Sequence, residues 1–287
     1  MLDNPPLRVM QKANLSPEIF SGRVRLEGTI ALPLSERVEN KDVTFAFQGE
    51  ACDVETTKLV KDRQLTSDRL AIQVDNRSVS IGGRARFDGI PLQGTWRQPL
   101  GPGERRASQL LADVTLDQTA LSAFKIALPS GAFRGSAPAS FQLDLPIGAP
   151  PSFALSSSLQ GIGLSIPPLK WSKSPGTRGT LDIAGSLGPT PKVDRLKLGG
   201  GSLSAEGRVR FAQGGRLNSL ELSNVSLGSW LDAPVTIRPR APGQAPEIAI
   251  NGGTLDLRTA NFGGAGAGRD GGPIQVNLDR LVVSEGI

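Results

Sequence analysis

The side chains that most often carry acid–base and metal chemistry are scarce in this chain. Histidine, the usual general base near neutral pH and a common ligand of transition metals, is absent from the 287 residues. The single cysteine, Cys52, has no second cysteine with which to form a disulfide or a multi-cysteine zinc site. We interpret Cys52 as a buried or half-buried small residue, because a cysteine nucleophile normally needs a base beside it.

Carboxylates and glycines form no recognisable catalytic or phosphate-binding motif. Asp182 and Asp194 illustrate the scatter of the acidic residues, whose spacing does not force any two of them together. The glycine-dense stretch 263–268 is followed by no Gly-Lys-Ser/Thr, and its neighbours have the pattern of strands, so we expect a flexible turn there. The run 199–201 is expected to be a bulge or tight turn. Together these features predict a chain that is not an enzyme and that uses no metal and no cofactor.

Arginines occur in pairs that alternate with apolar residues. The chain has 32 Lys and Arg against 27 Asp and Glu, a net charge of +5, and the two signs are interspersed. A nucleic-acid reader would add stacking aromatic residues on the same face, whereas these rows carry Ser, Glu and Thr. We predict a solvated outer face and no nucleic-acid partner. The pairs are Arg23 with Arg25, Arg84 with Arg86, and Arg208 with Arg210.

The elements that carry these pairs have a period of two residues. In 203–211 every odd position is apolar or glycine and every even position is polar; 79–87 and 22–32 alternate in nearly the same way. With 35 Gly, 22 Pro and 5% aromatic residues, this pattern predicts an all-β fold with one or two short helices. We expect an elongated, twisted antiparallel sheet of repeated amphipathic strands that forms a groove. Further strands are expected at 140–145, 152–159, 180–187, 247–257 and 273–283.

Short helices, breaks and chain organisation complete this prediction. Asp117 can cap a helix over 117–126, and single helical turns are expected at 227–231 and 17–20, with flexible breaks at 173–176 and 261–272. The first twenty residues lack the basic start and continuous apolar core of a signal peptide, and no apolar run comes near the ~20 residues of a membrane-spanning helix. We expect one elongated β-repeat segment over 1–287, an internal piece of a longer protein. Its possible sub-units are 1–107, 108–190 and 191–287.

The alternating segments also resemble one another. Gly-Arg-Val/Ala-Arg-Leu/Phe begins at Gly22, Gly83 and Gly207, at intervals of 61 (83 − 22) and 124 (207 − 83) residues, near one and two copies of a unit of roughly 60. Asp-Arg-Leu at 68–70 and at 194–196 precedes two of the copies by 15 and 13 residues. Such a repeat predicts stacked strand groups, each of which buries its apolar face beside its neighbours.

The order of motifs in the middle of the chain resembles the AsmA-like superfamily, and within it the central region of the YhdP-type branch. The likeness covers about 69–231 best and its motifs are compositional. They are Leu-Asp-Gln-Thr-Ala-Leu at 116–121, Phe-Arg-Gly-Ser-Ala-Pro at 133–138, Phe-Gln-Leu-Asp-Leu-Pro at 141–146, Ser-Ser-Ser-Leu-Gln-Gly-Ile-Gly-Leu at 156–164, Pro-Pro-Leu-Lys at 167–170, and Gly-Gly-Ser-Leu-Ser-Ala-Glu before Gly207.

This resemblance implies a long β-groove in the periplasm, tethered to the inner membrane in the full-length protein, that carries phospholipid between the inner and outer membranes. Acyl chains would slide along a dry face, and the family has no catalytic residues to transfer. Membranes would be reached through parts absent from this chain, whose protein partners the sequence does not identify. The candidate lipid contacts are the apolar positions Val24, Leu26, Ile30, Val79, Ile81, Phe87, Phe141, Leu143, Leu203, Val209 and Phe211.

Other interpretations of the same rows stay open. The rows can form an ordinary packed core instead of an open trough, because large exposed apolar patches are rare in soluble proteins. As an alternative function, the chain can be a structural or assembly scaffold of the envelope that binds other proteins through its β-edges. A carbohydrate-active β-solenoid would need aromatic platforms, for which only Trp96, Trp171 and Trp230 are available.

Overall fold

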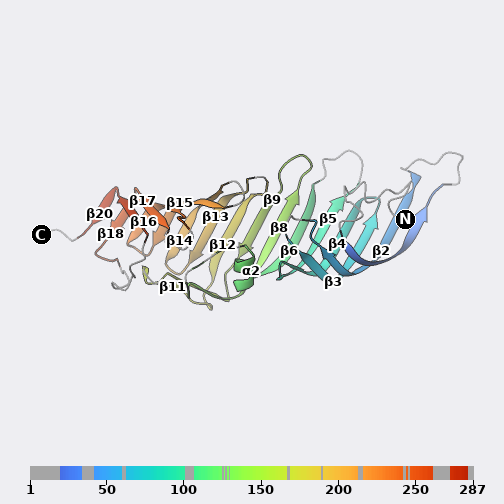
Figure 1. Ribbon diagram of the computed structural model, residues 1–287, viewed down its shortest axis with the longest axis horizontal. Helices are drawn as coiled ribbons and strands as arrows, with labels where there is room; N and C mark the ends of the chain where they lie inside the picture. Colours follow the sequence, from blue (N-terminus) through green and yellow to red (C-terminus); the bar gives the residue numbers. More distant parts are fainter. Residues whose placement is uncertain are drawn as a thin grey trace. The chain divides into compact units, whose positions relative to one another are not determined.

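The protein is mostly β, as its sequence predicts. Seventeen strands belong to one large, twisted, mostly antiparallel sheet that is not closed, and three short strands form a second sheet. A single short helix, α2, is present among the described residues (Figure 1). The computed structural model describes residues 20–33, 42–59, 63–100, 107–124, 126, 128, 130–166, 169–188, 190–212, 216–241, 244, 246–260 and 272–283.

The chain forms two compact units, which we describe separately. Unit 1 comprises residues 1–115 and 140–149, and unit 2 comprises residues 116–139 and 150–287. In unit 1 each strand pairs antiparallel with the next strand along the chain from β1 to β6. Its strands are β1 (Ser21–Ala31), β2 (Thr44–Thr56), β3 (Leu65–Asp75), β4 (Ser78–Phe87), β5 (Ile90–Pro99), β6 (Ser108–Leu116) and most of β8 (Ala137–Leu145).

Hairpin register in unit 1 keeps the apolar positions of successive strands on one face. Cross-strand partners lie on the same face of a sheet, so a row of partners shows which side chains lie side by side. One row runs through Leu26, Gly49, Ile72, Ile81, Trp96 and Leu110. A covered cluster closes one end of this face, where Phe47, Ile72, Ile81 and Trp96 pack against buried Val43, Phe45, Val74, Val79 and Leu100.

The turn between β4 and β5 is held by an ion pair. Asp88 has a positive φ of 47°, and its carboxylate accepts hydrogen bonds from the Arg63 guanidinium at 2.5 Å and from the backbone N–H of Gln64 at 2.8 Å. Desolvation raises the pKa of Asp88, but the hydrogen bonds from Arg63 and Gln64 outweigh it and the pKa is lowered below its ordinary 3.8. Folding therefore stabilises the ionised form of the Asp88 carboxylate.

Asp88→Asn is expected to destabilise unit 1 by about 1–2 kcal/mol at pH 7, because a charge-assisted pair is lost. A carboxyl group whose pKa is lowered on folding stabilises the protein above its unfolded pKa, and this contribution is lost as the pH falls through the folded pKa. The gap between wild type and variant in urea unfolding should thus close in acid. The exposed Asp68→Asn serves as the control. A gap that stays constant down to pH 2 contradicts this account.

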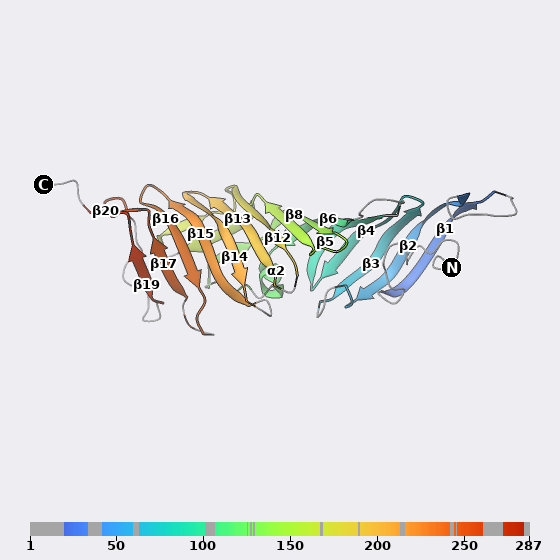
Figure 2. The same ribbon diagram turned by 90° about the horizontal axis from the view of Figure 1, so that it is seen from above.

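Unit 2 repeats the antiparallel pattern. Strands β9 and β12 to β17 pair in the order β9, β12, β13, β14, β15, β16, β17, and Figure 2 shows β13 to β16 running side by side. β19 and β20 then add in parallel to β17 and β18. The bounds are β9 (Ser152–Ser157), β12 (Gly179–Ser186), β13 (Lys192–Gly200), β14 (Leu203–Phe211), β15 (Leu217–Leu227), β16 (Leu231–Arg238), β17 (Glu247–Asn251), β18 (Thr254–Asp256), β19 (Ile274–Asn277) and β20 (Arg280–Val282).

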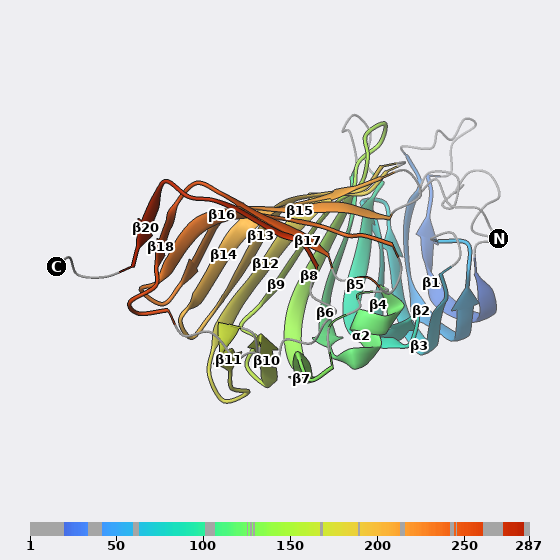
Figure 3. The same ribbon diagram turned by 60° about the vertical axis from the view of Figure 1, so that its left-hand side comes forward.

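A small second sheet covers one end of the unit 2 sheet. It consists of β7 (Phe133–Gly135), β10 (Ile162–Ile166) and β11 (Trp171–Lys173), and α2 (Gln118–Ala123) precedes it (Figure 3). Asp117 caps α2, as predicted: its carboxylate accepts a hydrogen bond from the Ala120 N–H at 2.9 Å.

Lys173 of the small sheet lies against the unit 2 sheet, with its aliphatic stem beside Gly179 of β12 and Gly200 of β13. The residue is only 2% exposed, and its Nζ donates hydrogen bonds to the carbonyls of Leu159 at 2.7 Å, Ile162 at 2.9 Å and Ser174 at 3.2 Å. The break predicted over 173–176 is therefore wrong at its first position. The turn begins only after Lys173, at residue 175.

The structure corrects three further predictions and leaves others open. The strand expected over 273–283 is divided into β19 and β20, with residues 278 and 279 between them. The helical turn expected over 227–231 is a hairpin turn, in which Leu227 and Leu231 are cross-strand partners. The strand expected over 247–257 is divided into β17 and β18 at Gly252 and Gly253, which have φ values of 93° and 79°. Residues 17–19 and 261–271, on which a helical turn and a glycine-rich loop were predicted, lie outside the described residues.

The internal repeat has a structural counterpart. Leu70 pairs with Gly83 in β3–β4, and Leu196 pairs with Gly207 in β13–β14. In both pairs the register shifts beside the leucine, between Thr66 and Arg69 and between Val193 and Leu196. The two Asp-Arg-Leu segments therefore occupy equivalent positions next to a β-bulge.

Candidate functional site

One face of the unit 2 sheet is apolar along its whole series of strands. Two neighbouring rows of this face, which we call the open rows, are composed of half-buried aliphatic and aromatic side chains, with Val235 almost fully buried at 9% exposure. Polar side chains are absent from both rows among the paired positions described. The first row contains Phe153, Gly185, Val193, Val209, Leu220, Ile237 and Ile248, and the second contains Leu155, Ile183, Leu196, Gly207, Leu222, Val235 and Ile250.

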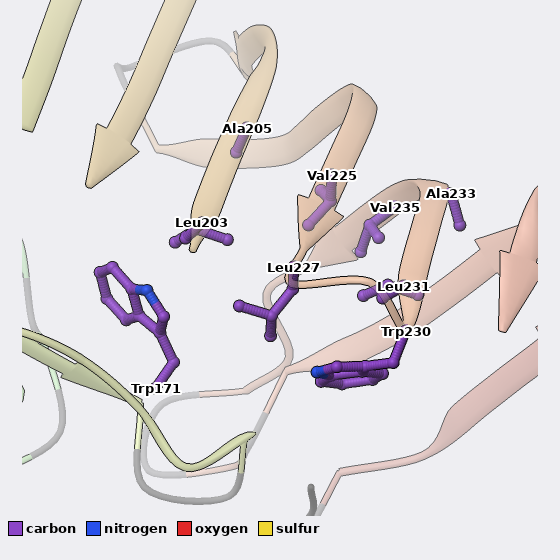
Figure 4. Packing of buried hydrophobic residues seen from close by; sticks show 9 residues of the cluster. All are labelled: Trp171, Leu203, Ala205, Val225, Leu227, Trp230, Leu231, Ala233 and Val235. Carbon is purple, nitrogen blue, oxygen red and sulfur yellow. The ribbon is translucent and has the colours of Figure 1, made fainter. Parts of the chain in front are cut away.

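The same face is covered by other side chains at the end of the strands where the turns 201–202 and 228–230 lie, which we call the closed end. Trp171 from the small sheet lies next to Leu203, and Trp230 lies beside Leu231 (Figure 4). The Trp171 indole N–H donates to the Gly200 carbonyl at 3.2 Å, which satisfies its polar atom within the cluster. Farther along, Leu181 and Leu198 pack against Leu159 and Ile162. This closed end is an ordinary core, and it extends into the open rows on β15 to β17: Val235 is one of its buried residues, and Leu222, Ile237, Ile248 and Ile250 pack against it. The part of the open rows on β9 to β14, with Leu220 on β15, lies beyond this core.

The open rows are long enough to accommodate a lipid tail. The first row crosses seven strands, from β9 to β17, and its part outside the covered cluster runs over the five strands from Phe153 on β9 to Leu220 on β15. Four spacings of ~4.8 Å give this part a length of about 19 Å. A bilayer's hydrocarbon core is ~30 Å thick, so one leaflet's acyl chain spans about half of that thickness. The rows can therefore hold an extended acyl chain that lies across the strands.

Two glycines of the unit 2 sheet allow neighbouring strands to approach closely. Gly185 and Gly207 belong to the open rows, where a side chain would point onto the apolar face. A Cβ added to Gly185 would collide with the Lys192 carbonyl oxygen, and one added to Gly207 would collide with the Glu221 carbonyl oxygen. The backbone of the next strand thus lies very close to both glycines, at the points where the register shifts in β12–β13 and in β14–β15.

Unit 1 has the same arrangement on a shorter stretch. Leu26, Leu70, Leu92, Leu110 and Val114 are half-buried on the apolar face, next to the covered cluster. Glycines 28, 49 and 94 in these rows would also meet the backbone of the adjacent strand if they carried a Cβ. Both units therefore combine one covered end with a partly accessible apolar surface.

The opposite face of the unit 2 sheet is polar, and ion pairs join neighbouring strands across it. Lys197 contacts Glu206 at 2.8 Å and Arg208 contacts Glu221 at 2.6 Å across neighbouring strands. The hydrogen bond from Arg208 is the main cause that lowers the pKa of Glu221. Such pairs suit a solvated face. The predicted arginine pairs lie on the polar faces of their strands, and all six arginines except the partly exposed Arg210 are exposed, as expected.

The candidate lipid contacts occupy three kinds of position. Val79 and Leu203 are 5% and 7% exposed inside the covered clusters, and so lie at the covered ends. Val24 and Ile30 are 61% and 42% exposed on β1, which pairs with β2 alone among the described strands. The remaining candidates are half-buried on apolar faces: Leu26, Ile81 and Phe87 in unit 1, Phe141 and Leu143 on β8, and Val209 and Phe211 on β14.

The alternating pattern did not predict several residues of the open rows, because a β-bulge moves the apolar positions of a strand from odd to even residue numbers or the reverse. In β13 the register slips between Val193 and Leu196, and in β15 it slips between Leu222 and Val225. A strict period of two therefore fails in both strands. The signal that could have found them is two short alternating runs of opposite parity, joined by two polar residues.

Cys52 and the tryptophans offer little for chemistry. Cys52 is half-buried on β2, as predicted. Trp171 and Trp230 are buried and Trp96 packs on the unit 1 cluster, so none of them forms an exposed platform for a sugar ring. In the part of the chain that is described, no three Cys, Asp or Glu residues gather in a way that could hold a metal ion. Nor does any described helix have the length and apolarity to cross a bilayer.

Fold and site together define a class: an open, mostly antiparallel β-sheet protein in which each unit has one apolar, partly covered face and one polar face. No protein-family model matches the chain, and no curated protein or solved structure is significantly similar to it.

Proposed function

We propose that this chain is a non-catalytic segment of an AsmA-like envelope protein whose apolar faces carry phospholipid acyl chains between the inner and outer membranes. The observation that supports this most is the pair of open rows, which are apolar, half-buried and long enough for an acyl chain. A conduit needs a dry surface without fixed polar partners, because strong directional contacts would hold the lipid in place. The chain would act in the periplasm, and the sequence resemblance supplies that location.

Site-specific photocrosslinking tests this proposal in cells. A photoreactive apolar residue at Phe87, Leu143 or Phe211 is expected to capture phospholipid, detected by mass spectrometry of the purified adduct. The same residue at Ser80 or Thr236, on the polar rows of β4 and β16, is the matched control and should capture none. Failure at all three apolar positions of a folded protein, or equal capture at the polar positions, would contradict a lipid conduit.

A second candidate function is a scaffold that binds other envelope proteins through a β-edge. The observation that favours it is β1, an eleven-residue strand whose only partner among the described strands is β2. The Arg25 carbonyl points at Gly49 of β2, and because orientation alternates along a strand, Leu26 and Gly28 turn their N–H groups to the free edge. A partner captured by wild type and lost in Leu26→Pro would support the scaffold, and capture that persists would oppose it.

A further inference from the structure

The hairpins of unit 2 differ in charge between the two ends of its apolar face. Because consecutive strands are antiparallel, the ends of β12, β14 and β16 lie beside the starts of β13, β15 and β17. We call this side of the sheet, which is formed by strand ends and hairpin turns and not by an edge strand, the open edge. It adjoins the first open row. At the closed end the turns 201–202 and 228–230 contain only Gly, Ser and Trp, and the exposed Arg178 before β12 and Asp232 in β16 carry opposite charges.

The open edge is basic. Asp194 and Glu247 are the carboxylates near it, and each already faces an arginine: Arg210 lies 4.0 Å from Asp194, and Arg238 lies 3.7 Å from Glu247. The edge therefore has an excess of three positive charges, a large part of the net +5 of the whole chain. Its five basic residues, from three adjacent hairpins, are Lys192, Arg210, Arg216, Arg238 and Arg240.

The three basic residues that supply this excess are accessible to a ligand. Lys192, Arg216 and Arg240 are exposed, and none of them forms an ion pair among the described residues. Lys192 begins β13, Arg216 directly precedes β15 and Arg240 lies two residues after β16. The apolar side chains nearest to them along the chain are Val193, Leu217 and Ile237, of which Val193 and Ile237 belong to the first open row. Because successive side chains of a strand point to opposite faces, Lys192 lies on the polar face beside its partner Arg210, whereas Arg216 and Arg240 lie outside the strands.

We infer that the open edge binds the anionic head group of an amphiphile whose tail lies on the open rows. This inference rests on the proposed function and adds the chemical class of the ligand, a phosphate or other anionic head on an acyl tail. A cation near an anionic head group gains from Coulomb attraction that salt screens, while the tail gains by leaving water. The charge then places the head at the open edge, and the tail extends from it along the open rows, across the strands.

Binding of two fluorescent lipids with identical acyl chains tests the inference on the whole chain. Wild type is expected to bind phosphatidylglycerol about tenfold more tightly than zwitterionic phosphatidylcholine at low salt, because each basic group near an anionic surface contributes modestly. The variant Lys192→Gln/Arg216→Gln/Arg240→Gln should lose this preference and keep its phosphatidylcholine affinity. The control Arg25→Gln/Arg84→Gln/Arg86→Gln removes equal charge from the polar face of unit 1 and should keep the preference.

The possible outcomes separate the inference from the proposed function. Equal affinity for both lipids in wild type, or a preference that survives in the triple variant, overturns the head-group site while leaving the conduit intact. If neither lipid binds, the conduit fails and the head-group site fails with it. Glycerol phosphate, which has the head chemistry but no tail, should compete poorly; if it competes as well as the lipid, the open edge is a site for free anions and the inference is wrong.

Discussion

Replacing Lys173 with alanine is expected to lower the free energy of unfolding of unit 2 by about 3–5 kcal/mol. The ammonium group is fully enclosed and its three hydrogen-bond acceptors are backbone carbonyls, so alanine leaves buried acceptors without this donor. The aliphatic stem also fills space over two glycines. A Cβ on Gly179 would lie 2.8 Å from Lys173 Cε, and one on Gly200 would lie 2.8 Å from its Cδ. Alanine removes both contributions at once.

Lys173→Met separates the two contributions, because methionine retains most of the stem and none of the donors. It is expected to cost about 1–3 kcal/mol, the penalty for unsatisfied buried acceptors. Urea unfolding gives the totals, and amide hydrogen exchange of β10 and β11 shows whether the small sheet is the part that loosens. An alanine variant within about 0.5 kcal/mol of wild type would show that Lys173 does not stabilise the small sheet.

The pH dependence of the stability of wild type and of Lys173→Met gives an independent check. Burial lowers the pKa of Lys173 below its ordinary 10.5. The folded state therefore releases its proton at a lower pH than the unfolded chain, and wild type should gain stability relative to Lys173→Met as the pH rises from the folded pKa toward 10.5. The opposite slope would mean that the three carbonyls stabilise the ammonium more than desolvation opposes it.

The strands and their faces could be predicted from sequence because alternation and pairing agree. Segments such as 203–211 place arginine and glutamate on one face and aliphatic residues on the other, and a shift of register by one residue would move the whole set to the wrong face. The bounds of β4 and β14 accordingly match the predicted segments to within one residue. The pairing of Leu70 with Gly83 and of Leu196 with Gly207 extends this agreement to the repeat.

The mistaken helical turn at 227–231 has a simple geometric cause. Leu227 and Leu231 are four residues apart, the spacing that also joins neighbours on a helix. With a three-residue turn between two strands, the same spacing instead makes them cross-strand partners. Gly228, with a φ of 56°, allows the chain to reverse there. A glycine at the first turn position was the signal for the hairpin.

The small sheet could not be predicted from sequence for a different reason. Its strands have three to five residues, too few for a period to be seen. Its buried lysine contradicts the general rule that lysine is exposed, and only the tertiary arrangement supplies the three carbonyls that permit its burial. Whether the rows of unit 2 form a covered core or an accessible surface depends on where this small sheet ends, so sequence alone left both interpretations open.

Replacing Gly207 or Gly185 with alanine is expected to destabilise unit 2 by about 1–3 kcal/mol or more, because each new methyl group meets a backbone atom that cannot rotate away. At Gly207 the added Cβ would lie 2.7 Å from the Leu222 Cα and closer still to the Glu221 carbonyl oxygen; at Gly185 it would lie 2.9 Å from the Val193 Cα. Relief requires the neighbouring strands to separate at these two positions. Denaturant unfolding measures the loss of stability.

Gly176→Ala is the matched control, because nothing lies within 4 Å of a Cβ at this turn position. It should be neutral or stabilise by about 0.4–1 kcal/mol through the reduced entropy of the unfolded chain. If the close approach of β14 and β15 also shapes the lipid surface, the Gly207→Ala protein that remains folded at low temperature should give less phospholipid crosslinking from Phe211 than wild type, while Gly176→Ala should not differ from wild type. Unchanged stability and crosslinking in Gly207→Ala would show that the close approach of β14 and β15 is not needed for either property.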